Sequence, residues 1–263
     1  MRRSTWTTKL ITALSVIILL VIWQVGAVWL DAAVILPTPG TTLSALVSLV
    51  QQKPFSLNII TTIGRALRSF LLIFIVGSFF GILAGYSKRV HAFLVPFLVL
   101  FKATPVMSVI LLAFIWFSSG TVPLFSAFLM GFPVMFIQVE QGVQLISPRL
   151  REMTVVYGFS PFRRLTHLVI PSMLPSIVTG AKASLSMVWK VVIAAEVLTV
   201  PRYGVGSRMQ LAQVHLETAE VLAWTLIAVL LTAVGDMLFI AMLSLPKYIR
   251  RIRWRKRKVE PCN

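Results

Sequence analysis

Six apolar stretches of the chain are long enough to cross a membrane as helices. The hydrocarbon core of a bilayer is about 30 Å thick, and roughly 20 helical residues span it. Helices satisfy their own backbone hydrogen bonds, as lipid requires. The predicted spans are residues 10–30, 69–86, 91–117, 122–139, 172–198 and 219–245. The pattern therefore predicts an all-α membrane protein with six transmembrane helices.

The first apolar stretch differs from a secretory signal. A signal has an apolar core of about 7–15 residues and a cleavage site of small residues. Residues 10–30 form a longer run that ends in Val28, Trp29 and Leu30. We therefore predict a retained anchor, with removal of the segment as the alternative. In the more polar stretch that follows, residues 41–50 are a candidate for a short helix at the membrane interface.

Prolines interrupt two of the predicted spans. The third span is broken at residues 102–105, where Lys102 precedes Pro105, and the fourth contains Pro133. Proline removes a backbone donor, and a membrane tolerates the freed groups only where protein or water satisfies them. Protein or water is therefore expected around both positions.

The composition leaves no space for a second globular domain. Of 263 residues, 57% are hydrophobic and 13% are charged, whereas about 25% of the residues in soluble domains are charged. Cys262 is the single cysteine of the sequence, which excludes a disulfide framework and any multi-cysteine metal site.

The 25 basic residues far outnumber the 8 acidic ones, for a net charge of +17. In a soluble protein this excess suggests nucleic acid, but membrane proteins concentrate Lys and Arg on the cytoplasmic side. If the N-terminus is cytoplasmic, 17 of the 25 basic residues lie on the inner side. Five lie outside, namely Lys53, Arg65, Arg68, Arg202 and Arg208. Three lie within spans, namely Lys102, Lys182 and Lys190. We predict that both termini are cytoplasmic and that the basic tail faces membrane lipid rather than nucleic acid.

The longest hydrophilic break on the inner side, residues 147–167, is predicted to hold two short helices. Each begins with an N-cap serine and a proline at the first helical position, Ser147-Pro148 and Ser160-Pro161. Gly158 stands where a left-handed residue would end the first helix. Pro171 is predicted to stop the second helix.

The second of these helices is predicted to be amphipathic. Its apolar face consists of Phe162, Leu165 and Leu168 or Val169 at helical spacing. The polar face carries Arg163, Arg164, Thr166 and His167. A helix of this kind, too short to span a membrane, suits docking against a partner.

The loop resembles the EAA loop of permease subunits in bacterial ABC importers, which also precedes the last two spans. The matching residues are Glu152, Gly158, Ile170, Pro171 and Pro175, while Met153 and Thr154 replace the two alanines of the motif. The resemblance extends over roughly residues 60–255 and is to the nitrate/sulfonate/taurine group. Its further matches are residues 191–196, 203–206, Gly235-Asp236 and Arg253-Trp254-Arg255.

This resemblance implies a type I ABC importer permease fold in the bacterial inner membrane. It also implies a homodimer, two cytoplasmic ATPase subunits that receive the loop, and an extracytoplasmic solute-binding protein. A small anion such as a sulfonate or nitrate is the favoured solute, with thiamine precursors as an alternative. The chain would divide into an anchor with an extracytoplasmic segment (1–60), a permease core (61–245) with the coupling loop 147–171, and a basic tail (246–263).

Two groups of residues are candidates for function. Those expected to couple to the ATPase are Glu152, Gly158, Phe162, Arg163, Arg164, Leu165, Ile170, Pro171 and Pro175. Ionisable groups within lipid are costly and by default functional, and the candidates for the translocation path are Lys102, Trp189, Lys190 and Glu196.

Each group has a simpler structural alternative. Glu152 is expected to cap its helix, to pair with Arg149 or Arg151, or to bind the partner. Lys190 has an interhelical ion pair with Asp236 or Glu140 as its alternative, and Glu196 has a structural role. Gly77, Gly81 and Gly85, at four-residue spacing, indicate close helix packing rather than a dimer contact.

Motifs of other functional classes are missing from the sequence. It has no Gly-x-x-x-x-Gly-Lys-Ser/Thr loop, so ATP hydrolysis is assigned to a separate subunit, and it has no Gly-x-Ser-x-Gly elbow. His91, His167 and His215 are scattered, which argues against a metal site. We predict a transport subunit that is not an enzyme and has no cofactor. The alternative function is an ion-gradient-driven transporter, which expects inverted repeats that are not found here.

Overall fold

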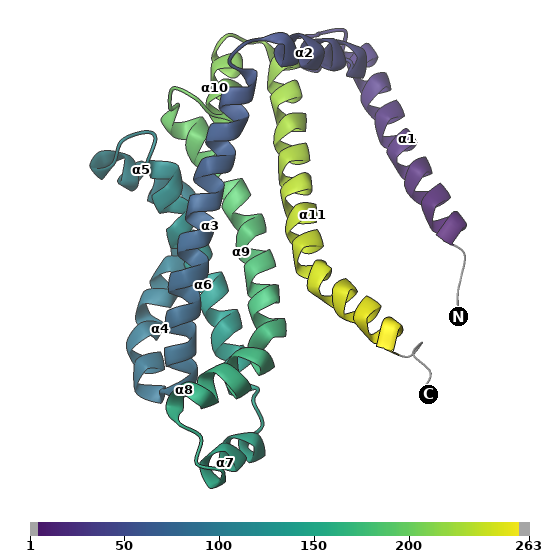
Figure 1. Ribbon diagram of the computed structural model, residues 1–263. Coiled ribbons are helices and arrows are strands. Elements are labelled where there is room, and N and C mark those ends of the chain that lie inside the picture. The colour runs from purple at the N-terminus through teal and green to yellow at the C-terminus, as the bar shows by residue number, and fades with distance from the viewer. Residues whose placement is uncertain (1–4, 258–263) are drawn as a thin grey trace.

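The computed structural model describes the backbone of residues 5–257 and the side chains of residues 10–242. Every regular element in that part of the chain is helical, which confirms the predicted all-α fold (Figure 1). The elements in order are α1 (Thr5–Leu30), α2 (Pro39–Gln51), α3 (Phe55–Tyr86), α4 (Lys88–Ala103), α5 (Val106–Trp116), α6 (Val122–Gln144), α7 (Pro148–Val156), α8 (Pro161–Arg164), the π-helix η1 (Leu165–Val169), α9 (Ile170–Thr199), α10 (Val205–Val214) and α11 (Thr218–Arg257).

Five helical segments of the described chain are long and apolar enough to cross a membrane. They are Leu10–Leu30, Phe55–Tyr86, Val122–Gln144, Pro161–Thr199 and Thr218–Met242. The pair α4 and α5 meets the same criteria together and gives a sixth span if it is counted as one. The six predicted spans therefore correspond to these segments.

Helix α3 begins at Phe55, well before the predicted start of the second span at residue 69. Arg65, which the sequence pattern placed outside the membrane, lies within this helix and forms an ion pair with the buried Glu196. Because the charge is paired, the helix continues past Arg65 without leaving an isolated cation in lipid. The predicted division of the chain at residue 60 falls inside α3.

Helices α3, α6 and α9 form the centre of the molecule (Figure 1). Glycines bring their backbones together: a Cβ at Gly81 would lie 2.8 Å from the carbonyl oxygen of Phe136, and one at Gly85 would lie 2.5 Å from Cβ of Val143. Gly77 is equally tight against Met135. The predicted packing role of the three glycines is therefore confirmed, and the helix that they approach is α6 of the same chain.

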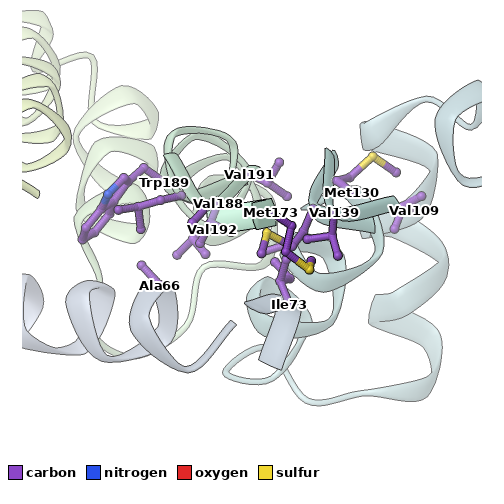
Figure 2. Packing of buried hydrophobic residues seen from close by; sticks show 14 of the residues in the cluster. Ala66, Ile73, Val109, Met130, Val139, Met173, Val188, Trp189, Val191 and Val192 are labelled. Carbon is purple, nitrogen blue, oxygen red and sulfur yellow. The ribbon is translucent and has the colours of Figure 1, made fainter. Parts of the chain in front are cut away.

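The apolar core joins the same three helices. Ile73 of α3, Val139 of α6 and Met173 and Val188 of α9 are fully buried and belong to one cluster (Figure 2). Close contact of backbones and side chains along the whole length of α6 makes α3, α6 and α9 one body. A displacement of α9 is therefore transmitted directly to α6.

The third span is broken where the sequence predicts it. Helices α4 and α5 are bent by 101° at the break between Ala103 and Val106. Pro105 has no N–H group to continue the helix, and the hydroxyl of Thr104 donates to the carbonyl of Leu100 at 2.7 Å. The interruption therefore ends α4 at Ala103, one residue after the exposed Lys102.

The two ends of the central body differ in what covers them (Figure 1). Helices α7 and α8 lie at one end, which we call the loop end, and α2 and α10 lie at the other, the opposite end. Helix α1 stands away from α3, α6 and α9, and the predicted helix at residues 41–50 lies within α2. The side chains of the basic tail after Met242, and Cys262, lie outside the described residues.

Candidate functional site

Helix α7 is anchored to the central body at the loop end. Arg151 donates a hydrogen bond to the carbonyl of Val143, near the end of α6. Its guanidinium lies 5.7 Å from the centre of the Tyr86 ring, at the end of α3. Thr154 is buried beneath the helix. One face of α7 is therefore fixed to α3 and α6, and the other is left free.

Gly158 ends α7 in the left-handed conformation that the sequence predicts, with φ +64°. Its N–H donates to the carbonyl of Val155 at 3.0 Å, and the N–H of Phe159 donates to the carbonyl of Thr154 at 2.9 Å. These two bonds form a Schellman motif, which satisfies carbonyls that the helix end would leave open. The turn between α7 and α8 is thus fixed by backbone geometry.

Helix α8 runs directly into α9, so the prediction that Pro171 stops the second loop helix is wrong. Ser160 caps α8, and its hydroxyl accepts from the N–H of Arg163 at 3.3 Å. The helix then continues through the π-turn η1 into Ile170–Thr199. In an α-helix the ring of Pro171 would collide with the carbonyl of His167. The wider π-turn directly before Pro171 contains that carbonyl, and it lets the helix continue.

Glu152 is exposed at the loop end and has no hydrogen bond or ion pair among the side chains of residues 10–242. The considered pairing with Arg149 or Arg151 does not form, because Arg151 is bound to α6 instead. Large apolar side chains are exposed around it: Met153, Val155, Val156, Tyr157 and Phe162, of which Val156 is 82% exposed. We call this set, with Glu152, the loop surface. Its free carboxylate and apolar groups are typical of a surface that another protein covers.

The predicted apolar face of α8 is divided between this surface and the core. Phe162 is 73% exposed, whereas Val169 is buried and Leu165 and Leu168 pack against the central cluster. Arg163 is exposed, and Arg164 is partly buried. Leu165 therefore attaches the helix to the body, and Phe162 belongs to the side that faces outward.

Glu196 lies at the opposite end and is fully buried. Its carboxylate accepts from Arg65 at 2.6 Å, from the hydroxyl of Thr62 at 2.9 Å and from the N–H of Gly206 at 3.0 Å. These partners belong to α3 and α10, and Glu196 belongs to α9. The geometry favours the structural role that the sequence left open, because the carboxylate is fully buried and bound by residues of three helices.

Neighbouring groups complete this buried network. The side-chain oxygen of Asn58 accepts from the N–H of Gly204 at 3.1 Å, and Arg65 also donates to the carbonyl of Tyr203 at 2.7 Å. A Cβ at Gly206 would lie 2.3 Å from the carbonyl of Ile193. Sequence reasoning missed Asn58, Thr62 and Arg65. These three polar residues are separated by four and three residues, as on one face of a helix, and they directly precede an apolar span. That pattern is the signal that could have identified them.

The structure separates the other predicted path residues. Trp189 is buried and lines an apolar cavity of about 340 Å³ between α3, α9 and α11, where Gly235 touches its ring. Lys190 is exposed and does not line this cavity. The two carboxylates that were expected as ion-pair partners of Lys190 have other partners. Asp236 accepts a hydrogen bond from Ser186 at 2.8 Å, and Glu140 is paired with His91. Lys102 lines a second cavity, formed with α6 and α9.

Comparisons with known proteins agree with this architecture. Residues 77–247 match the family described as "binding-protein-dependent transport system inner membrane component". The putative aliphatic sulfonates transport permease protein SsuC of Bacillus subtilis is 29% identical over 241 residues, covering 90% of this chain and 85% of that protein.

Two further relatives carry different solute names. The taurine transport system permease protein TauC of Escherichia coli is 26% identical, over 79% of this chain and 77% of that protein. The bicarbonate transport system permease protein CmpB of Synechococcus elongatus is 25% identical, over 56% and 53%. The resemblance to the nitrate/sulfonate/taurine group is thereby confirmed. The chain belongs to the family of binding-protein-dependent transport system inner membrane components, as a multi-pass permease subunit of an ABC importer.

Proposed function

We propose that this permease couples solute movement to ATP hydrolysis in separate cytoplasmic ATPase subunits, which bind the loop surface. The observation that carries the proposal is the unbroken helix from Pro161 to Thr199. It joins the exposed Phe162 of the loop surface to the core of the membrane part. A partner that moves α8 therefore moves α9.

The proposed coupling requires α8 to be rigidly connected both to α9 and to α7. A helix of 39 residues is about 58 Å long at 1.5 Å per residue, which exceeds the thickness of a bilayer. Between α7 and α8, the two hydrogen bonds of the Schellman motif at Gly158 fix the turn that connects these helices. Rotation of the partner would thus tilt α9 together with α6, and it would turn the translocation path from one side to the other. Of the coupling residues, Glu152 and Phe162 would contact the ATPase, and Leu165, Ile170, Pro171 and Pro175 would carry the motion.

The solute is proposed to be a small sulfonate-like anion. Support comes from the names of the relatives, which refer to aliphatic sulfonates, taurine and bicarbonate. An extracytoplasmic solute-binding protein would deliver the solute at the opposite end, near α2 and α10. A second copy of the chain would supply the other half of the path.

The proposed orientation places the loop end and both termini in the cytoplasm. The Thr5 end of α1 and the Arg257 end of α11 both point toward the loop end (Figure 1), which supports this arrangement. The basic residues of the tail would then face the anionic lipid of the inner leaflet, as the positive-inside rule expects.

A charge reversal in the loop surface tests the coupling role. In membranes that contain the permease and its ATPase subunits, Glu152→Lys should abolish co-purification of the ATPase and solute uptake, while the amount of inserted permease stays normal. The matched control is Glu217→Lys, the same change at an exposed position of the opposite end, which should retain the ATPase. Normal co-purification and uptake in Glu152→Lys would refute the assignment.

A further inference from the structure

Charged groups within the described spans are partnered unequally. The carboxylates in the interior are all engaged: Glu196 with Arg65, Glu140 with His91, and Asp236 with Ser186. Glu220 lies in the first turn of α11, at the opposite end. Lys102 and Lys190 have no hydrogen bond or ion pair within residues 10–242. Neither lysine is therefore paired with a carboxylate of the described chain.

The two lysines lie at the same depth. The rings of Phe101 and Phe132 are 6.4 Å apart, so Lys102 of α4 is level with the middle of α6. A Cβ at Gly131 would be 3.6 Å from Val188, which places Lys190 of α9 at almost the same level. This level is about 20 Å from the end of α6 at the loop end, at 1.5 Å per residue. Both ammonium groups therefore start from well inside a hydrocarbon core about 30 Å thick.

A cavity opens beside Lys102 at this depth. Its volume is about 360 Å³, and its lining includes Lys102, Met130, Pro133, Gln138 and Met187, from α4, α6 and α9. Lys190 follows Met187 by three residues and so lies on the same face of α9. The volume lies at the lower end of the range for small-molecule sites. The cavity thus combines one amide and one cation with otherwise apolar walls, and Lys190 lies one turn of α9 away from its lining residue Met187.

An unpaired lysine inside a membrane is costly, so two at one level require compensation. Water in the cavity provides part of it, and an anion provides more, because ammonium groups form charge-assisted hydrogen bonds with oxyanions. We propose that Lys102, Lys190 and Gln138 form an oxyanion-binding stretch of the translocation path, which admits small sulfonates and carboxylates and disfavours cations. This inference rests on the proposed transport function, and it selects the anionic solute class over thiamine-like cations.

The test uses the whole importer, with its ATPase subunits and binding protein, in proteoliposomes. The variants are Lys102→Gln, Lys190→Gln and the double variant, and the probes are taurine, ethanesulfonate, bicarbonate and thiamine. Each single variant should lower anion uptake at subsaturating solute about tenfold, the loss expected for one charge-assisted hydrogen bond. Lys102→Arg and Lys190→Arg should keep most of the uptake. ATP hydrolysis stimulated by the binding protein should persist in every variant.

Lys182→Gln is the matched control. Lys182 is also exposed on α9, but it lies nearer the loop end and does not line the cavity, so its replacement should leave uptake within about twofold of the unmodified importer. Normal anion uptake in the double variant, or an equal loss in Lys182→Gln, would overturn the inference while leaving ATPase coupling intact. Import of thiamine in preference to the anions would overturn the inference and the anionic solute together. Loss of ATPase association in the unmodified importer would instead refute the proposed coupling.

Discussion

Two glutamates at opposite ends of the permease are used in opposite ways. Glu196 is buried and accepts hydrogen bonds from Thr62, Arg65 and Gly206. Glu152 is exposed and has no partner among the described side chains. The first carboxylate holds three helices together, and the second is available to another protein. The carboxylate at the opposite end is therefore enclosed by the permease, and the one at the loop end is left exposed.

Glycines show the same contrast. Gly206 is needed because its surroundings leave no space, since a Cβ would lie 2.3 Å from the carbonyl of Ile193. Gly158 has open space around it, and it is needed because its φ of +64° disfavours other residues. Substitution of Gly206 should therefore change global stability, whereas substitution of Gly158 should change coupling.

The largest effect is expected for Glu196→Ala. It leaves Arg65 nearly buried without a counter-charge, and breaking such a pair costs about 3–5 kcal/mol. Thermal unfolding of the detergent-purified protein should show a large decrease in midpoint, and the double variant with Arg65→Ala should recover part of it. Glu152→Ala should leave the midpoint unchanged. Equal midpoints for the two single variants would remove the contrast between the ends.

A smaller loss of stability is expected for Gly206→Ala. Overpacking costs about 1–3 kcal/mol, because Ile193 and Glu196 cannot both move away from the added methyl group. Gly64→Ala is the matched control, since nothing lies within 4 Å of a Cβ at that position in α3. The control should be neutral or slightly stabilising in the same unfolding assay. If Gly206→Ala behaves like Gly64→Ala, the close packing of α10 on α9 is wrong.

The smallest change in stability is expected for Gly158→Ala. An L-residue in the left-handed region costs about 1–2 kcal/mol, which is confined to the turn between α7 and α8. Uptake should decrease while the unfolding midpoint stays within error, and Gly158→Asn should be milder because asparagine tolerates this conformation. A global loss of stability in Gly158→Ala would show that the turn supports the core.

Local patterns predicted much of this architecture. The uncharged run Leu10–Leu30, the break at residues 102–105 and the left-handed Gly158 each depend on neighbouring residues, so their sequence signals are direct. Proline is also a local signal, but the prediction that Pro171 ends a helix is wrong, because the π-turn before it accommodates its ring. Helix propensities refer to the α-helix, so the π-turn could be recognised only from the backbone of the structure.

The sequence could not predict which charged residues far apart in the chain pair with one another. The early start of α3 depends on Arg65, whose partner Glu196 is 131 residues away. The pairing of Glu140 with His91, and hence the isolation of Lys190, depends equally on how α4 meets α6. Candidate charges could be named from the sequence, but their partners could not. The exposure of the loop residues could therefore be predicted from local amphipathicity, whereas the charge pairs inside the membrane could not.

The proposed coupling requires α8 and α9 to move as one rigid element when the ATPase binds ATP. This rigidity can be measured as the distance between spin labels at positions 163 and 183 in the assembled importer, with Cys262→Ser and labelled protomers diluted by unlabelled ones. The helix places the two labelled backbones about 30 Å apart. Rigid movement predicts one narrow distance that is the same with and without ATP. A distance that shifts or splits on ATP binding would show a hinge at η1 and refute rigid coupling.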